Sequence, residues 1–171
     1  MRKKPVALFI GRFQPFHLGH LAAVKWIASR SSKVIIAVGS SQKSFEPENP
    51  FTAPERKRMI RKQLAEAGLA KKCRLVSVTD VNDNERWVAH VDAAVPVYDV
   101  VYSNNALVKR LMKEKGKTVK AIPFFRRAIY DATKIRGRMK KGAPWSDRVP
   151  KRVLVLLRKM KAEERIRHLR A

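Results

Sequence analysis

Five short apolar runs, separated by segments with helical periodicity, set the pattern of the chain. Their length and their β-branched content predict strands. Runs that are apolar throughout are typical of strands covered on both faces, as in a parallel sheet. The predicted strands are 6–10, 33–38, 74–79, 99–102 and 118–122.

The segments between these runs carry apolar residues three and four positions apart, which predicts helices that pack by one face. Thr52 and Glu55 form a capping-box pair at the start of one helix, and we expect Glu55 to serve this cap and not the chemistry. Gly68 and Gly116 mark two helix ends. The predicted helices begin near His17, Thr52, Glu85, Leu107, Asp131 and Val149.

Strands and helices alternate with short connections, which indicates a doubly wound α/β fold. Right-handed crossovers place the loops that follow the strands along one edge of the sheet, and ligands bind in the crevice outside that edge. Polar loops follow four of the predicted strands, at 11–20, 39–44, 80–84 and 103–105. We therefore expect these four loops to converge on the functional site.

The loop at 11–20 carries two histidines at the start of a predicted helix. His17 and His20 are three residues apart, so both imidazoles can reach one ligand. A helix N-terminus attracts anions through its free N–H groups and its positive dipole end, and Gly19 permits close approach of the backbone. A polyphosphate therefore suits this loop. A metal site or two surface residues are the alternatives, although no zinc spacing and no neighbouring cysteine supports a metal.

A second candidate anion site lies at 129–139. Asp131 can cap a helix whose first turn holds Thr133 and Lys134, with Arg136 one turn further on. A hydroxyl, free amides and a guanidinium at a helix start can cradle a phosphate. A capped, basic surface helix is the alternative. Beyond an amphipathic helix at about 149–160, the charged tail 161–171 is expected to be either a solvated helix or disordered.

Composition limits the class of protein. The chain has 171 residues, of which 45% are hydrophobic, and this suits a single domain with a sizeable core. No apolar run approaches the roughly 20 residues of a membrane span. The first residues do not resemble a signal peptide, and the single Cys73 fits a reducing cytosol. We expect one domain, a cytoplasmic location and no membrane association.

The charge of the chain is strongly positive. Lys and Arg number 39 against 14 Asp and Glu, which gives a formal net charge of +25. Such a charge attracts polyanions, including nucleotides, RNA and membrane surfaces. The basic residues are scattered along the chain, however, and no nucleic-acid-binding motif is present. We interpret most of the excess as a solvated surface, with nucleic-acid binding as the less favoured alternative.

The ordered set of motifs resembles a known family. Segment 17–20 is similar to the H-x-G-H signature of nucleotidyltransferases, and segment 133–136 resembles their second signature, S-x-T-x-[IV]-R. Segments 39–44, 49–56, 80–88, 101–108 and 164–166 resemble, in the same order, blocks of the archaeal-type nicotinamide-nucleotide adenylyltransferases. The resemblance covers essentially the whole chain. It implies a Rossmann-like, doubly wound, five-stranded parallel sheet in the order 3-2-1-4-5, at about 1–128, with a C-terminal helical extension at about 129–171.

The resemblance also implies a reaction, in which nicotinamide mononucleotide attacks the α-phosphorus of ATP in line and forms NAD and pyrophosphate with Mg²⁺. It implies that the mononucleotide phosphate, and no covalent enzyme intermediate, makes the new bond. The metal would be held mainly by phosphates, so no protein ligand is assigned. A homo-oligomer is implied as well.

Residue roles follow from the same resemblance. The catalytic residues, which would hold the triphosphate, are Arg12, His17, His20 and Arg136. The implied ATP-binding residues are Gly11, Phe13, Gln14, Gly19, Ser103, Asn104, Asn105, Tyr130, Thr133, Lys134 and Ile135. The implied mononucleotide-binding residues are Ser40, Gln42, Lys43, Asp80, Val81, Asn84 and Trp87.

The chain departs from the family pattern at several positions. Asp131 stands where a serine is usual, Phe45 where a histidine is common, and Pro54 where a glycine is common. The alternative functions are transfer to flavin mononucleotide, phosphopantetheine or glycerol phosphate, or nucleic-acid binding on an inactive nucleotide fold. Trp87, as a stacking platform, favours the nicotinamide acceptor, with burial against the sheet as its alternative role.

Overall fold

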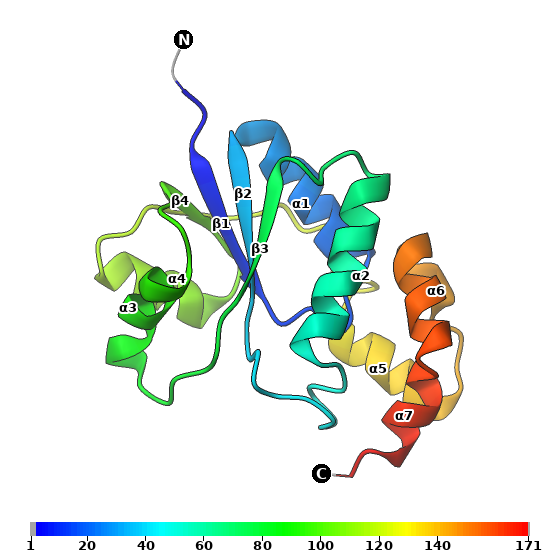
Figure 1. Cartoon of the computed structure of the whole chain (residues 1–171). Helices are drawn as coiled ribbons and strands as arrows, with labels where there is room; N and C mark the ends of the chain where they lie inside the picture. The colour runs from blue at the N-terminus through cyan, green and yellow to red at the C-terminus, as the bar shows by residue number, and fades with distance from the viewer. Residues whose placement is uncertain (1–2, 171) are drawn as a thin grey trace.

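Five parallel strands form the centre of the fold. Figure 1 shows the sheet with helices packed around it. The computed structural model describes residues 3–170. The strands are β1 (Val6–Gly11), β2 (Lys33–Val38), β3 (Cys73–Ser77), β4 (Val100–Tyr102) and β5 (Val119–Lys120). They lie in the order β3-β2-β1-β4-β5, and every neighbouring pair is parallel. The predicted Rossmann-like sheet is confirmed.

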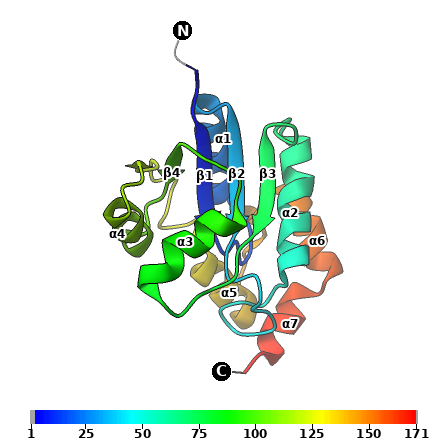
Figure 2. The same ribbon diagram turned by 60° about the vertical axis from the view of Figure 1, so that its left-hand side comes forward.

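Helices cover both faces of the sheet (Figures 1 and 2). They are α1 (Leu18–Arg30), α2 (Ala53–Glu66), α3 (Asn84–Ala94), α4 (Ala106–Glu114), α5 (Ala132–Lys141), α6 (Lys151–Lys159) and α7 (Ala162–His168). The core on one face is formed with α1, α2 and the C-terminal helices, and the core on the other face with α3 and α4. No helix within residues 3–170 is long and apolar enough to cross a membrane.

The central strand β1 contributes to both cores because successive side chains of a strand point to opposite faces. Leu8 joins Ile35 and Val101 in the core beneath α3 and α4. Its neighbour Phe9 faces the other core, together with Val24 of α1. A sheet buried in this way leaves the loops at the carboxyl ends of its strands as the place for a ligand.

Some predicted boundaries were wrong. The fifth strand is shorter than predicted, because the backbone N–H and carbonyl of Ile122 bond to the side chain of Asn104 and not to the sheet. The predicted helix at about 149–160 is confirmed as α6, although it begins at Lys151, and a short 3₁₀ turn, Ser146–Arg148, precedes it. Residues 162–168 of the tail form α7, whose Ala162 and Ile166 are buried in the core, so this segment is neither disordered nor simply solvated, and Ala171 lies outside the described residues.

The start of α2 is tied to the C-terminal helix α7. The predicted capping box is confirmed, since Thr52 Oγ1 accepts from the N–H of Glu55 at 3.2 Å and Glu55 accepts from the N–H of Thr52 at 2.8 Å. Arg165 of α7 then donates to both oxygens of the Glu55 carboxylate, at 2.8 and 2.9 Å. Burial by itself would raise the pKa of Glu55, but the hydrogen bonds from Arg165 and Thr52 outweigh it and lower the pKa. Glu55 is therefore structural, as expected.

We predict that Arg165→Ala lowers the free energy of unfolding by about 2 kcal/mol, because it removes charged hydrogen bonds from a largely shielded carboxylate. Arg167→Ala, on the same helix, breaks a more exposed ion pair with Glu163 and should cost no more than about 0.5 kcal/mol. Urea unfolding of both variants measures the difference. Equal losses would contradict this account of α7.

Candidate active site

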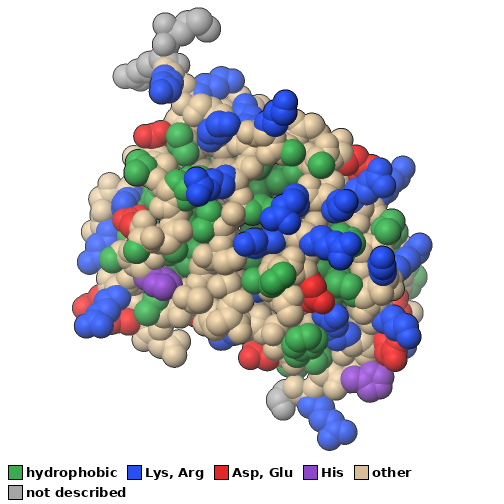
Figure 3. Space-filling view, viewed as in Figure 1, with side chains coloured by type: hydrophobic (Ala, Val, Ile, Leu, Met, Phe, Trp, Pro, Cys, Tyr) green, Lys and Arg blue, Asp and Glu red, His purple; other side chains and the backbone are tan. Residues whose placement is uncertain are grey.

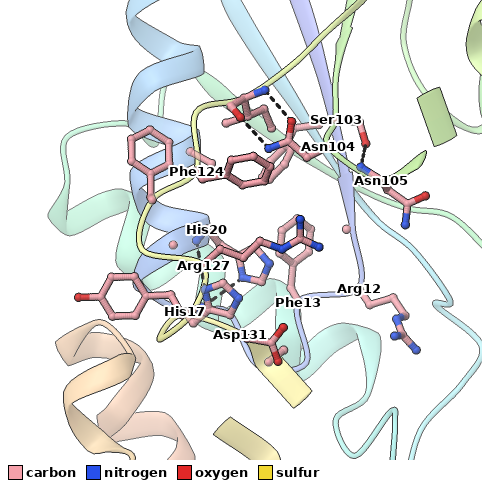
Figure 4. Close-up of a pocket in the computed structure, with 18 of the residues that line it drawn as sticks. Arg12, Phe13, His17, His20, Ser103, Asn104, Asn105, Phe124, Arg127 and Asp131 are labelled. Atoms are coloured by element: carbon pink, nitrogen blue, oxygen red, sulfur yellow. Dashed lines mark hydrogen bonds between the residues drawn. The ribbon is translucent and has the colours of Figure 1, made fainter. Parts of the chain in front are cut away.

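A cleft of about 410 Å³ opens at the carboxyl ends of β1 and β4 and is bordered by the start of α5 (Figure 4). The loops 11–20 and 103–105 meet there with the segment that leads into α5. The predicted residues that line the cleft are Gly11, Arg12, Phe13, Gln14, His17, Gly19, His20, Ser103, Asn104, Asn105, Tyr130, Thr133 and Arg136. The structure thus brings both candidate anion sites into one cleft.

The two histidines cap α1 for each other. His17 is the N-cap residue, and its Nδ1 accepts from the backbone N–H of His20 at 3.3 Å. The Nδ1 of His20 accepts from the backbone N–H of His17 at 3.2 Å, and the ring centroids are 3.6 Å apart. This is a capping box made of two imidazoles. It occupies two of the N–H groups that we had expected to be free for an anion, so that part of the prediction was wrong.

The reciprocal cap determines the protonation of both rings. A nitrogen that accepts a hydrogen bond carries no proton, so each neutral ring keeps its proton on Nε2. Burial lowers the pKa of His17 from 6.5 to about 4, although the Asp131 carboxylate acts in the opposite direction. Burial, followed by the neighbouring His17, lowers the pKa of His20 well below 6.5. At neutral pH both rings are therefore uncharged Nε2–H donors at the cleft.

Side chains from distant elements hold the loop between β1 and α1. The Gln14 amide donates to the carbonyl of Phe51 at 2.9 Å and accepts from its N–H at 3.0 Å. Nη1 of Arg136 donates to the Gln14 carbonyl at 2.9 Å. Gly11 leaves room for the ring of Phe13, since a Cβ would lie 2.8 Å from its Cζ. Gln14 borders the cleft as predicted, but its amide is occupied in holding the loop.

The two predicted arginines differ in their surroundings. Arg136 is 8% exposed, and its Nε and Nη2 donate to the carbonyl of Pro47 at 3.2 Å and to Thr133 Oγ1 at 3.4 Å. Because a guanidinium has five N–H bonds, Arg136 retains donors for a ligand. Arg12 lies 3.4 Å from Glu48 at the surface, and in Figure 4 its guanidinium points away from the histidines. Arg136 is therefore already in place, whereas Arg12 must turn to meet a ligand.

The polar side chains after β4 mainly support the local backbone. Ser103 Oγ accepts from the N–H of Asn105 at 3.1 Å, and Asn105 Oδ1 caps α4 by accepting from the N–H of Val108 at 3.0 Å. The amide of Asn104 bonds to the backbone of Ile122, as Figure 4 shows. These three residues line the cleft as predicted and also hold its wall in place.

Two residues of the second signature lie outside the cleft. Ile135 is fully buried in the core, and Nζ of Lys134 donates to the carbonyl of Ala128 at 2.9 Å. Since successive helical positions point in different directions, Thr133 and Arg136 can border the cleft while these two do not. The structure does not support direct ATP contacts from the side chains of Lys134 and Ile135.

Some of the residues predicted to bind the mononucleotide form a separate cluster at the ends of β2 and β3. An Asp80 oxygen accepts from Ser40 Oγ at 2.9 Å, and the other lies 3.5 Å from Nζ of Lys43. The N–H of Asp80 donates to the Gln42 side chain at 3.1 Å. The structure therefore joins four of the seven predicted residues, Ser40, Gln42, Lys43 and Asp80, in one network.

The other three predicted residues lie further along the chain. Val81 is half-buried in the loop after β3. Asn84 begins α3 and lines a different hollow, with Arg110 of α4. Trp87 is half-buried and packs against the core beneath α3 and α4, which agrees with the alternative of burial against the sheet. The structure does not bring these three side chains to the cleft that holds the histidines.

Sequence reasoning missed an aromatic and basic wall of the cleft. Phe124, Phe125 and Arg127 line it, and Phe124 is 68% exposed. The guanidinium of Arg127 lies 5.4 Å from the centroid of the Phe124 ring. The run Phe124-Phe125-Arg126-Arg127, shortly after the last strand, is the signal that could have identified this wall, since such groups stack on flat rings.

The residues that the structure describes bring few carboxylates close enough together to hold a metal ion. Within residues 3–170, no group of three His, Cys, Asp or Glu side chains is placed to hold one. Asp131 supplies a carboxylate to the cleft, and its Oδ1 caps α5 by accepting from the N–H of Lys134 at 2.8 Å. The cap predicted for Asp131 is confirmed, and its second oxygen can still face a ligand.

Comparison with known proteins adds to this geometry. Residues 8–138 match the family described as cytidylyltransferase-like. A nicotinamide-nucleotide adenylyltransferase from Pyrococcus abyssi is 44% identical over 162 residues, covering 95% of this chain and 87% of the relative. A protein of the same name from Thermoplasma volcanium is 46% identical over 167 residues, covering 98% and 93%.

Solved structures show the same fold. A bifunctional NMN adenylyltransferase/ADP ribose pyrophosphatase from Francisella tularensis superposes with a TM-score of 0.81 at 23% identity. The match covers 99% of this chain and 52% of that one, so this chain spans about half of the longer protein. A second structure from that organism, complexed with AMP and a Mn ion, gives a TM-score of 0.78.

We predict that His17→Asn improves the acid stability of the fold. Wild-type His17 takes up a proton below pH 6.5 when unfolded but only near pH 4 when folded, so folding stability is lost between these values. At about pH 4.5 the free energy of unfolding is lowered by about 2 kcal/mol through this protonation. The variant should not show this loss, because asparagine takes up no proton. At pH 7 the stabilities should be similar, because asparagine also caps a helix.

Urea unfolding at the two pH values, compared with wild type, measures this effect. His168→Asn, at an exposed position near the end of α7, is the control substitution. An acid sensitivity that His17→Asn leaves unchanged would contradict the protonation assigned to the buried ring.

Proposed function

The chain belongs to the nicotinamide-nucleotide adenylyltransferase family, and we propose that its cleft holds ATP while nicotinamide mononucleotide attacks the α-phosphorus in line. The chain is a nucleotidyltransferase of NAD biosynthesis. In the proposed scheme the mononucleotide phosphate forms the new P–O bond and pyrophosphate leaves. The protein then needs to position two phosphates and to stabilise the charge of the transition state.

The observation that carries the proposal is the pair of uncharged imidazoles at the cleft. The reciprocal cap leaves Nε2–H of His17 and of His20 as donors whose positions are set before substrate binds. Preorganised donors aimed at developing charge are usually the largest single contribution to such a reaction. We assign both donors to the α-phosphate oxygens.

The remaining phosphate contacts follow from the borders of the cleft. Arg136 retains N–H donors beside Thr133, and we assign both residues to the β- and γ-phosphates, where the leaving pyrophosphate gathers charge. Arg12 would leave Glu48 and turn toward the triphosphate. The exposed Phe124, which sequence reasoning missed, can stack on the adenine ring.

The acceptor is assigned to the cluster at the ends of β2 and β3. Lys43, Ser40 and Gln42 can surround a phosphate at the strand next to the histidine loop. Lys43 contributes the positive charge once Asp80 releases it. Asn84 and Trp87 stay part of the proposal as contacts to the nicotinamide end, and they require a movement of the segment that leads into α3.

A divalent ion, Mg²⁺ in this proposal, would neutralise the charge of the triphosphate. A related structure contains AMP with a Mn ion. The residues of the cleft fit an ion held mainly by phosphates, since Asp131 supplies one carboxylate and no larger set of ligands is present within residues 3–170.

The domain organisation, the location and the oligomeric state of the protein are proposed on separate grounds. The start of α5 borders the cleft, and residues of α5, α6 and α7 share one core with the sheet, which supports treating 1–171 as one nucleotidyltransferase domain. A cytoplasmic location rests on the single Cys73, which fits a reducing compartment. A homo-oligomer is proposed from the family resemblance alone.

Incubation with ATP, Mg²⁺ and nicotinamide mononucleotide tests the function. NAD and pyrophosphate should appear in equal amounts, and flavin mononucleotide offered in place of the nicotinamide acceptor should give no product. Product from flavin mononucleotide without any NAD would overturn the assignment of the acceptor.

His17→Asn in the same assay tests the mechanism. The variant retains the helix cap but removes one Nε2–H donor from the cleft, so kcat should fall by roughly 10²- to 10³-fold. Circular dichroism and urea unfolding at pH 7 should match the wild type. A folded variant with near-normal kcat would remove His17 from the mechanism.

A further inference from the structure

Arg56 of α2 is a fully buried cation that the proposed mechanism does not use. Its side chain is 0% exposed and is the largest of the fully buried side chains within residues 3–170. None of the ion pairs formed by residues 3–170 includes it. Its guanidinium instead donates to backbone carbonyls: Nη1 to Arg12 and to Gly39, both at 2.8 Å, Nη2 to Ser40 at 3.1 Å, and Nε to Thr52 at 3.3 Å.

These carbonyls belong to the two halves of the site. Arg12 is in the loop after β1, which carries the histidines, and Gly39 and Ser40 are in the loop after β2, which carries the acceptor cluster. A single nitrogen, Nη1 of Arg56, therefore bridges the two loops. The backbone adds one further link there, from the N–H of Gly39 to the carbonyl of Gly11 at 2.9 Å. The separation of the loops is thus set by this backbone bond together with one buried side chain, that of Arg56.

The charge of Arg56 is costly at this position. Burial lowers its pKa to about 10, so the guanidinium is still charged at neutral pH and has lost its hydration. An apolar side chain of similar volume would fill the space without that desolvation. What an apolar side chain cannot supply is several directed N–H bonds from one rigid plane. The hydrogen bonds to the two loops are therefore what Arg56 provides at this position and an apolar side chain would not.

We propose that Arg56 is a positioning residue, which holds the ATP loop and the acceptor loop at the separation that in-line attack requires. The proposal rests on the function proposed above. It concerns the step in which both substrates must be aligned, and not the binding of either substrate alone. A displacement of about 1 Å between reacting groups can cost about 100-fold in rate.

Arg56→Lys tests this role, because lysine retains the positive charge but cannot reach the same set of carbonyls. We expect kcat for NAD formation to fall by about 10- to 100-fold. The dissociation constants of ATP alone and of nicotinamide mononucleotide alone, measured by calorimetry, should change by less than about threefold. Misalignment of the two substrates lowers kcat and leaves both dissociation constants unchanged. General destabilisation of the protein does not produce this pattern.

Ile60→Val is the matched control, since Ile60 lies on the same helix and is fully buried in the hydrophobic core. It should keep its kcat and both affinities. Arg56→Gln provides a second, uncharged variant and should lose at least as much kcat as Arg56→Lys. Circular dichroism and thermal unfolding establish that each variant is folded before it is assayed.

The outcomes separate this inference from the proposed function. A wild-type chain that makes no NAD would overturn the proposed function, and this inference with it. A wild-type chain that makes NAD, together with a folded Arg56→Lys that retains its kcat, would overturn the inference alone. Loss of the fold in both Arg56 variants, but not in Ile60→Val, would make Arg56 a folding residue and would also overturn it.

Discussion

The reciprocal hydrogen bonds between His17 and His20 are the constraint on which the site depends. Each ring satisfies a backbone N–H at the start of α1, so each must present Nδ1 to the backbone and Nε2 to the cleft. One interaction thus begins the helix, stacks the rings and selects their tautomers. The same interaction turns two ionisable side chains into neutral donors, which can approach a phosphate without a change of protonation.

Buried polar side chains connect this constraint to the rest of the fold. Arg136 and the backbone of Phe51 hold Gln14, and Arg56 holds the carbonyl of Arg12, so the histidine loop is fixed from three directions. Each of these bonds joins the loop to an element far away in the sequence. The sheet brings the loops of neighbouring strands to one edge, and these side chains set their positions along it.

Sequence patterns predict the features that depend on neighbouring residues. The doubly wound parallel sheet follows from alternation and handedness, and the caps at Thr52 and Asp131 are local motifs, whereas the order of the strands is implied by the family resemblance. Features that depend on tertiary partners could not be predicted in this way. The early end of β5 follows from the bond between Asn104 and Ile122, and the use of Nδ1 in the cap depends on ring orientation, which spacing does not determine. The family resemblance predicts the acceptor residues, but not the contacts that join four of them in one network, nor the separation of that network from the cleft.

The central claim is that both imidazoles are neutral and carry their proton on Nε2 at neutral pH. Two-dimensional ¹⁵N NMR of the imidazole rings, recorded from pH 8 to pH 4 in the protein without substrates, measures this directly. The account predicts Nε2–H tautomers for His17 and His20 at pH 7, with titration of His17 only as the pH falls toward 4 and of His20 only well below pH 6.5. A proton on Nδ1, or titration of either ring near pH 6.5, would contradict it.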